Sequence, residues 1–197
     1  MNIEKELRSF ADMDMQLSSI DIDPKKIKAI LINEVVPLHP SLDFYSEQVS
    51  DYANSTIALF QKAGAQVEDV QDILELGIYL TNAIKLPKLE TTISTSTIEQ
   101  CLPILEKELS LFPNVCVIML MGDVAKKAFN KITRKHTKKA VIPAISTYKL
   151  RNQAFYYNDM RIIPSYIMTG KNVQIEKSKV EMASEDIALM LDIIKAS

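Results

Sequence analysis

The sequence is poor in glycine and cysteine, and it has no long apolar run. Only four of its 197 residues are glycine, where average usage is about 7%. The two cysteines, Cys101 and Cys116, lie among apolar neighbours, which is typical of buried thiols. No apolar run approaches the roughly 20 residues that a bilayer-spanning helix needs. The charged segment 1–14 has a helical pattern and lacks the layout of a signal peptide. These absences predict a soluble, cytoplasmic protein with no membrane partner.

The chain has enough apolar residues, 47%, for one domain over residues 1–197 with a sizeable core. Four short, continuous, β-branched runs are typical of strands buried on both faces. Helical patterns lie between them, which predicts right-handed β-α-β units. The expected fold is therefore a three-layer α/β/α domain with a central, mainly parallel, four-stranded sheet. The four runs are 27–34, 78–85, 115–122 and 160–168.

The exits of these strands are where we expect a ligand, because open α/β sheets bind ligands at the carboxyl ends of their strands. Glu34 ends the first run, and its carboxylate could orient a water or accept a proton. It could equally be a solvated strand end or a helix cap. The second run leaves through Asn82 and Lys85, and the amide of Asn82 suits the edge of a pyrimidine or the carbonyl of a loop.

The third and fourth exits are less specific. Gly122 and Asp123 open a helix, whose backbone amides would favour an anion, although Asp123 could simply cap that helix. The fourth exit offers Thr169 and Lys171. Two long connections, 35–48 and 133–159, lie beside these exits, and long loops in compact domains are often functional.

A basic segment at 126–139 carries seven Lys or Arg residues and no acid, although the net charge of the whole chain is only −2. Such a run can be a solvated helix face, but like charges repel unless an anion relieves them. The segment therefore suggests contact with a phosphate backbone. The candidate contacts are Lys126, Lys127, Lys131, Arg134 and Lys135, together with Lys171.

Taken in order, the exits resemble the motifs of the uracil-DNA glycosylase superfamily, from about residue 27 to the end. The stretch "YLTNAIK" is similar to the family's strand ending in Thr-Asn-x-x-Lys. The stretch "CLPILEKELSLFPNVCVIMLMGDVAKKAF" resembles its Cys-x-x-x-Leu helix, next strand and Gly-x-x-Ala turn. The stretch "YKLRNQAFYYNDMRIIPSYIMTGKN" resembles its Arg-Gly hairpin and a strand running into Thr-Tyr-His-Pro-Ser.

The resemblance implies roles for particular side chains. Asn82 would read a flipped uracil, and Glu34 matches the acidic residue of the family's Gly-Glu-Ala-Pro-Gly motif, which helps to place the attacking water. An aromatic after that motif stacks on the base, and Phe44 is the first choice here, with Tyr45 in reserve. Thr169 is a further candidate for contact with the base. The implied partners are single-stranded or damaged duplex DNA and a uracil-like base.

The departures from the family pattern concern the same motifs. The first motif reads Asn-Glu-Val-Val-Pro over 33–37, without its glycines, which let a backbone approach a substrate closely. The last motif's His-Pro-Ser falls on 167–169, and Ile167 cannot donate the hydrogen bond that the histidine gives to the leaving base. His39 or Thr169 could supply a substitute donor. Only Cys101 matches the four cysteines of the iron–sulfur branch, and Leu86 replaces another, so we expect no cofactor.

Three functions remain open. The first is a divergent glycosylase that removes uracil or another deaminated base from DNA. The second is a catalytically inactive binder of nucleic acid or nucleobase, which the missing histidine favours. The third is a protein-interaction module. Retention of Asn82 and Glu34 with the basic segment places glycosylase activity first.

Overall fold

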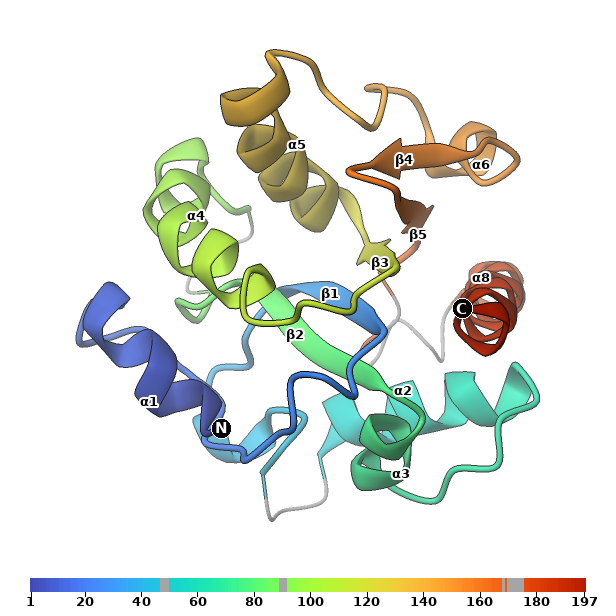
Figure 1. Cartoon of the computed structure of the whole chain (residues 1–197), viewed down its shortest axis with the longest axis horizontal. Coiled ribbons are helices and arrows are strands. Elements are labelled where there is room, and N and C mark those ends of the chain that lie inside the picture. Colours follow the sequence, from blue (N-terminus) through green and yellow to red (C-terminus); the bar gives the residue numbers. More distant parts are fainter. Residues whose placement is uncertain (47–49, 89–91, 168, 170–175) are drawn as a thin grey trace.

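The computed structural model describes residues 1–46, 50–88, 92–167, 169 and 176–197, and it contains a five-stranded sheet between two layers of helices (Figure 1). The strands run in the order β2-β1-β3-β5-β4. Neighbouring pairs among β2, β1, β3 and β5 are parallel, and β4 is antiparallel to β5. Their bounds are β1 Ala29–Val35, β2 Ile78–Ile84, β3 Val117–Met121, β4 Phe155–Tyr157 and β5 Met160–Ser165.

The mainly parallel α/β/α architecture is confirmed, but the expected number of strands, four, is wrong. The additional strand β4 is only three residues long and forms a hairpin with β5. Asn158 and Asp159 make the turn with φ angles of 47° and 65°, as the favoured two-residue hairpin turns require. A strand this short gives no periodic signal in the sequence.

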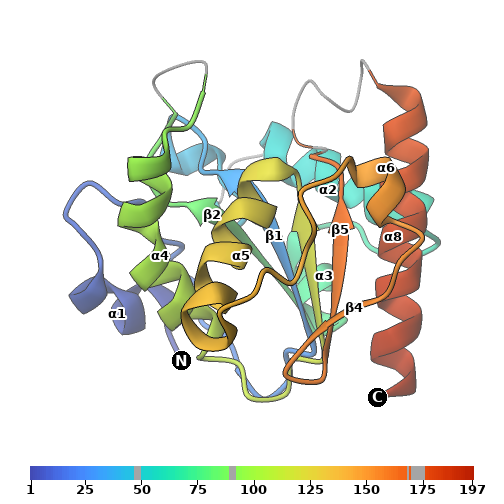
Figure 2. The ribbon, with the colours of Figure 1, turned by 90° about the horizontal axis from the view of Figure 1, so that it is seen from above.

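One layer of helices covers the first face of the sheet and contains α1 (Ile3–Leu7), α4 (Thr95–Leu109) and α5 (Asp123–Thr137). The other contains α2 (Asp51–Lys62), α3 (Val70–Glu75) and α8 (Lys177–Ala196). Figure 2 shows α4 and α5 on one side of the strands and α8 on the other. The described residues also form short helical turns: η1 (Arg8–Phe10), η2 (Pro40–Leu42) and α6 (Thr147–Leu150). No helix in these described ranges is long and apolar enough to cross a bilayer.

The strands are apolar throughout because both of their faces are buried. In β1, Ile30 and Ile32 pack toward α4 and α5, whereas Ala29 and Leu31 pack toward α2 and α8. Continuous Val, Ile and Leu runs are what a sheet covered on both faces requires. Of the two thiols, Cys101 is buried as predicted, and Cys116 is only partly buried.

The strand order creates a switch point between β1 and β3. From β1 the chain moves outward to β2, and it then returns across β1 to form β3 on the other side. The connections therefore leave the carboxyl ends of β1 and β3 in opposite directions, which opens a crevice in sheets of this kind. Glu34 lies near the end of β1, and Gly122 follows β3 directly. The fold thus places two of the predicted exits side by side.

Candidate functional site

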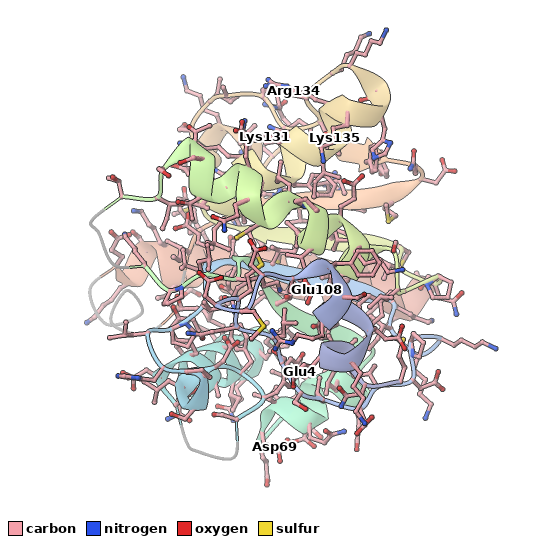
Figure 3. All side chains as sticks on the ribbon, turned by 90° about the vertical axis from the view of Figure 1, so that its left-hand side faces the viewer. Glu4, Asp69, Glu108, Lys131, Arg134 and Lys135 are labelled. Carbon is pink, nitrogen blue, oxygen red and sulfur yellow. The ribbon has the colours of Figure 1, made fainter. Side chains whose placement is uncertain are left out.

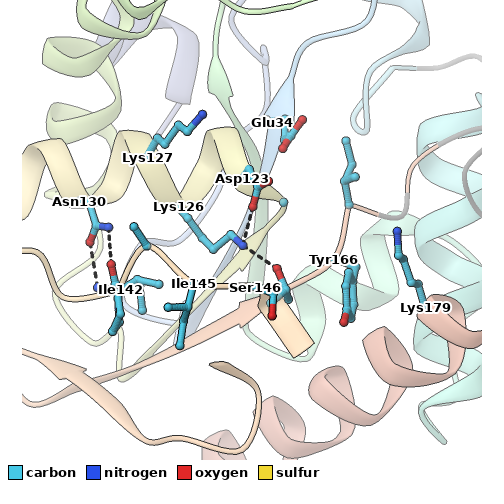
Figure 4. A pocket seen from close by; sticks show the side chains of 15 residues that line it. Glu34, Asp123, Lys126, Lys127, Asn130, Ile142, Ile145, Ser146, Tyr166 and Lys179 are labelled. Atoms are coloured by element: carbon cyan, nitrogen blue, oxygen red, sulfur yellow. Dashed lines mark hydrogen bonds and ion pairs between the residues drawn. The ribbon is translucent and has the colours of Figure 1, made fainter. Parts of the chain in front are cut away.

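A pocket of about 570 Å³ lies at this switch point (Figure 4). It is bounded by the end of β1, the beginning of α5, the segment 142–147, the residues after β5 and the beginning of α8. Its lining residues are Glu34, Gly122, Asp123, Lys126, Lys127, Asn130, residues 142–147, Tyr166, Ile167 and Lys179. Among the residues predicted from the sequence, the pocket therefore brings together Glu34, Lys126 and Lys127.

Glu34 is fixed by the first turn of α5. Its Oε1 accepts a hydrogen bond from the backbone N–H of Val124 at 2.9 Å. Burial raises the pKa of the Glu34 carboxyl, and the hydrogen bond from Val124 opposes that rise. The orphan amides at a helix start favour a negative charge. The helix-cap alternative is therefore part of the geometry, because the Glu34 carboxylate accepts backbone hydrogen bonds at the start of α5.

Gly122 makes this approach of the carboxylate possible. Its φ angle is 100°, and a Cβ at this position would lie 2.3 Å from Oε1 of Glu34. Any other residue would meet both the backbone strain and the carboxylate. The glycine before α5 is thus required by the position of Glu34.

Three lysines add positive charge to the pocket. Lys126 is 6% exposed, and its Nζ forms an ion pair with Asp123 at 2.7 Å and donates a hydrogen bond to Thr147 Oγ1 at 2.6 Å (Figure 4). Lys127 is exposed and has no ion pair among the described residues. Lys179 forms an ion pair with Glu176, and its Nζ lies 5.6 Å from the centre of the Tyr166 ring. Of these cations, Lys127 is the one most available to an anionic ligand.

Lys131, Arg134 and Lys135 lie farther along α5 (Figure 3), and two of these three cations form ion pairs with acids of α4. Lys131 pairs with Glu99 at 2.7 Å, and Lys135 pairs with Glu106 at 3.1 Å. Arg134 is exposed and has no ion pair in the described part of the chain. At about 1.5 Å per residue, Lys131 and Lys135 lie about 12 and 18 Å along the helix axis from Asp123. The segment is therefore not a single cluster around the pocket.

Asn82 does not line the pocket. It is 2% exposed, and its Nδ2 donates a hydrogen bond to Oδ1 of Asp43 at 3.1 Å. Its own Oδ1 is buried and has no hydrogen-bond partner among the described residues. The amide of Asn82 is therefore held by a carboxylate, and the loop-carbonyl partner considered from the sequence is not the one observed.

Two residues that sequence reasoning did not select lie beside these side chains: Asp43 bonds to Asn82, and Tyr52 bonds to the residue after Glu34. Burial raises the pKa of Asp43, against the hydrogen bond from the Phe44 amide and the charge of Lys85. The Tyr52 hydroxyl donates a hydrogen bond to the carbonyl of Val35 at 3.0 Å. Burial, and then the nearby charges of Asp43 and Glu34, raise the pKa of Tyr52 to about 12. Tyr52 thus lies within the fields of both carboxylates.

Both candidate stacking rings have partners inside the protein. Phe44 is 3% exposed, and its ring centre lies 5.6 Å from that of Tyr52. Tyr45 stacks on Tyr79 with centres 5.9 Å apart, and its hydroxyl oxygen accepts a hydrogen bond from the Leu80 amide at 2.7 Å. Because β2 is an edge strand, Tyr45 pairs an amide that the sheet leaves open. Base stacking by either ring stays a prediction.

The other predicted residues do not line this pocket or cannot be placed. Thr169 is 9% exposed and is not among the residues lining the pocket. His39 is exposed, next to η2. Lys171 lies outside the described residues. Ile167, which takes the place of the family's histidine in the predicted register, lines the pocket.

A family model for the uracil DNA glycosylase superfamily matches residues 21–184. The chain belongs to this superfamily. A comparison with curated proteins gives no significant match. The three-layer α/β/α fold with its mainly parallel sheet agrees with a uracil-DNA glycosylase-like domain.

The last motif of the uracil-DNA glycosylase superfamily can also be aligned with this chain in a second way, which gives a second register for its His-Pro-Ser. The Pro-Ser pair of the C-terminal half is Pro164-Ser165, at the end of β5, which would put Ile163 in the place of the histidine. Ser165 donates a hydrogen bond to Asp186 at 2.6 Å, and Asp186 also accepts from Arg151. Ile163 and Ile167 are both aliphatic, so neither register provides the donor.

Proposed function

We propose that the protein is a DNA glycosylase that hydrolyses the N-glycosidic bond of uracil or another deaminated base in cytoplasmic base excision repair. The observation that carries this proposal is the carboxylate of Glu34 in the switch-point pocket, with Oε1 held by Val124 and lysines nearby. The carboxylate can position a water, and the lysines can bind the phosphates of a DNA backbone. Membership in the superfamily supports the choice of a nucleobase in DNA as substrate.

The reaction separates charge, because the sugar becomes cationic as the base leaves as an anion. In the proposed mechanism, the Glu34 carboxylate stabilises the cationic sugar and orients a water toward C1′. The water adds hydroxide to C1′, and its proton neutralises the departing base. Lys127 would hold a flanking phosphate, and Lys126, paired with Asp123, would add positive charge behind it.

The reaction would be slow compared with that of a site that has the histidine. Loss of one preorganised donor to a developing anion typically costs about 100- to 1,000-fold in rate. Glu34 still provides electrostatic stabilisation at the sugar, and His39 or Thr169 would have to move to replace the donor. We therefore expect a low single-turnover rate, which is measured most directly with protein in excess over DNA.

A second candidate is a catalytically inactive binder of DNA or a nucleobase. The aliphatic residue in both registers of the last motif favours it, since Ile163 and Ile167 cannot stabilise a leaving anion. Phe44 and Asn82 are also buried, so a base reaches them only if the protein rearranges.

A single-turnover assay distinguishes these candidates. Single-stranded and mismatched DNA carrying uracil, hypoxanthine or xanthine is mixed with excess protein, and alkaline cleavage reveals abasic sites. Asn82→Ala is the test variant, and exposed Asn152→Ala is the matched control. The proposal expects product with the wild type and the control and loss of product with Asn82→Ala. No product on any base from folded protein would refute the glycosylase, and retained binding of uracil-containing DNA would then favour the binder.

A further inference from the structure

The orphaned carbonyl oxygen of Asn82 is an unusual feature of the end of β2. Buried polar atoms in folded proteins nearly always have a partner, because water that has been removed must be replaced. Oδ1 of Asn82 is buried without one among the described residues, although Nδ2 of the same amide is bonded to Asp43. The amide is therefore half satisfied, and the unsatisfied half is an acceptor.

The orientation of this amide follows from the chemistry of its partner. An ionised carboxylate only accepts hydrogen bonds, so the nitrogen of Asn82 has to face Asp43. A rotation of the amide by 180° would bring Oδ1 against the carboxylate. Asp43 is fixed in turn, because its Oδ1 also accepts the Phe44 amide at 2.9 Å. The charges that act on Asp43 are those of Lys85 in the chain after β2 and Glu108 in α4.

A fixed amide offers one hydrogen-bonding pattern to a ligand. Nδ2 has two hydrogens, and Asp43 takes one of them. The carbonyl oxygen and the other N–H remain, as an acceptor beside a donor. This pair complements a ring N–H beside a carbonyl, which is the edge of uracil, hypoxanthine and xanthine. Cytosine and adenine present a ring nitrogen acceptor beside an amino group and would require the rotated amide.

We propose that Asp43 is a positioning residue that locks the Asn82 amide in the orientation that accepts deaminated bases and rejects cytosine and adenine. This inference rests on the proposed function, because it assumes that Asn82 meets a base. Asp43 also lines a pocket of about 280 Å³ between residues 16–19 and 40–46. The carboxylate thus lies between a small solvent-connected pocket and the buried amide.

The test replaces the carboxylate by an amide of the same shape. In Asp43→Asn the new side chain can donate or accept, so the Asn82 amide can take either orientation. We expect the ratio of the single-turnover rate on uracil to that on cytosine in single-stranded DNA to fall by about tenfold or more, the discrimination that one bidentate base contact supplies. The exposed carboxylate of Asp14 provides the matched control, and Asp14→Asn should keep the wild-type ratio. An unchanged ratio in active Asp43→Asn would overturn the inference and leave the proposed function intact.

A second readout does not depend on catalysis. The side-chain NH₂ resonances of Asn82 are assigned by their absence in Asn82→Ala and are followed by ¹⁵N NMR as free uracil or cytosine is added. In the wild type, uracil should shift these resonances and cytosine should not, whereas both should shift them in Asp43→Asn. If these shifts are seen in a protein that releases no base, the proposed glycosylase activity is refuted, and the role of Asp43 in orienting Asn82 is supported. Resonances that respond to neither base would overturn the inference. They would indicate that Oδ1 of Asn82 has another partner, such as a buried water, and does not meet a base.

Discussion

Gly122 and Glu34 meet across the switch point, so closely that a Cβ on residue 122 would lie 2.3 Å from Oε1 of Glu34. The contact exists because the carboxylate accepts the Val124 amide in the first turn of α5. It links the exit of β1 to the exit of β3, and it fixes the negative charge on which the proposed chemistry depends.

Replacement of Gly122 by alanine should therefore displace Glu34. We expect Gly122→Ala to lower the single-turnover rate by about 100-fold through lost electrostatic preorganisation. The positive φ angle should also cost about 1 kcal/mol or more in the free energy of unfolding, measured in urea. Gly64→Ala is the matched control, because Gly64 has a φ angle of 92° and nothing within 4 Å of its Cβ position. Equal activity in the two variants would contradict the role of the contact.

The buried ion pair between Lys85 and Glu108, next to the end of β2, should contribute strongly to the free energy of unfolding. Lys85 Nζ lies 2.7 Å from Glu108 Oε2, and Oε1 accepts hydrogen bonds from Tyr79 and Thr81. Lys85→Met would leave a buried carboxylate unpaired, so we expect a loss of about 3–5 kcal/mol in the free energy of unfolding.

An exposed pair gives the comparison for that experiment. Lys131 pairs with Glu99 near the surface, and Lys131→Met should change the free energy of unfolding by at most about 1 kcal/mol. Urea unfolding at neutral pH measures both variants. Similar losses in the two would show that burial does not set the strength of the inner pair.

Asp186 should make stability fall as pH rises through the mildly acidic range. Burial raises its pKa from 3.8 to about 6, despite the hydrogen bond from Ser165 and the charge of Arg151. Glu185, which also contacts Arg151, adds a repulsive charge. Between these two pH values the folded protein binds more protons than the unfolded chain, so the free energy of unfolding decreases with rising pH.

The size of this effect can be isolated with Asp186→Asn. Between pH 4 and pH 6 the wild type should lose about 2–3 kcal/mol in the free energy of unfolding relative to the variant, by the linkage between pKa and stability. Urea unfolding at pH 4, 5, 6 and 7 gives both curves. Parallel curves would mean that the pKa of Asp186 is not raised.

Lys127 should contribute more to DNA binding than Lys135. Lys127 lines the pocket without an ion pair among the described residues, whereas Lys135 is paired with Glu106. Lys127→Ala should reduce the slope of log affinity against log salt by about 1. Lys135→Ala should change it less. Fluorescence anisotropy with labelled single-stranded DNA over a range of salt concentrations measures the slopes, and the reverse order would contradict the placement of the backbone at the pocket.

The sequence predicts the buried part of this fold well, because strands covered on both faces need continuous apolar runs. The runs 27–34, 78–85, 115–122 and 160–168 agree with β1, β2, β3 and β5 within a few residues at their ends. The short, half-exposed β4 has no such signal. The expected irregular connection 133–159 in fact contains the end of α5, α6 and β4.

The part of the site that lies at the carboxyl ends of strands could be predicted from the sequence. Glu34 and Gly122 come together because parallel strands end at one edge of the sheet. The bond between Asp43 and Asn82 joins residues 39 positions apart, and it depends on how the connection after β1 folds back on β2. The pairing of Lys131 and Lys135 with α4 likewise depends on the packing of two helices. Such contacts leave no local pattern in a single sequence.

The most direct test of the proposed function is the single-turnover release of uracil from single-stranded DNA by the wild type and by Glu34→Gln. The exposed Glu75→Gln serves as the control. We predict release by the wild type and the control, and a rate about 100-fold lower with Glu34→Gln, the contribution typical of a positioned carboxylate. Equal rates for Glu34→Gln and the wild type, or no release by the folded wild type, would contradict the proposed role of Glu34.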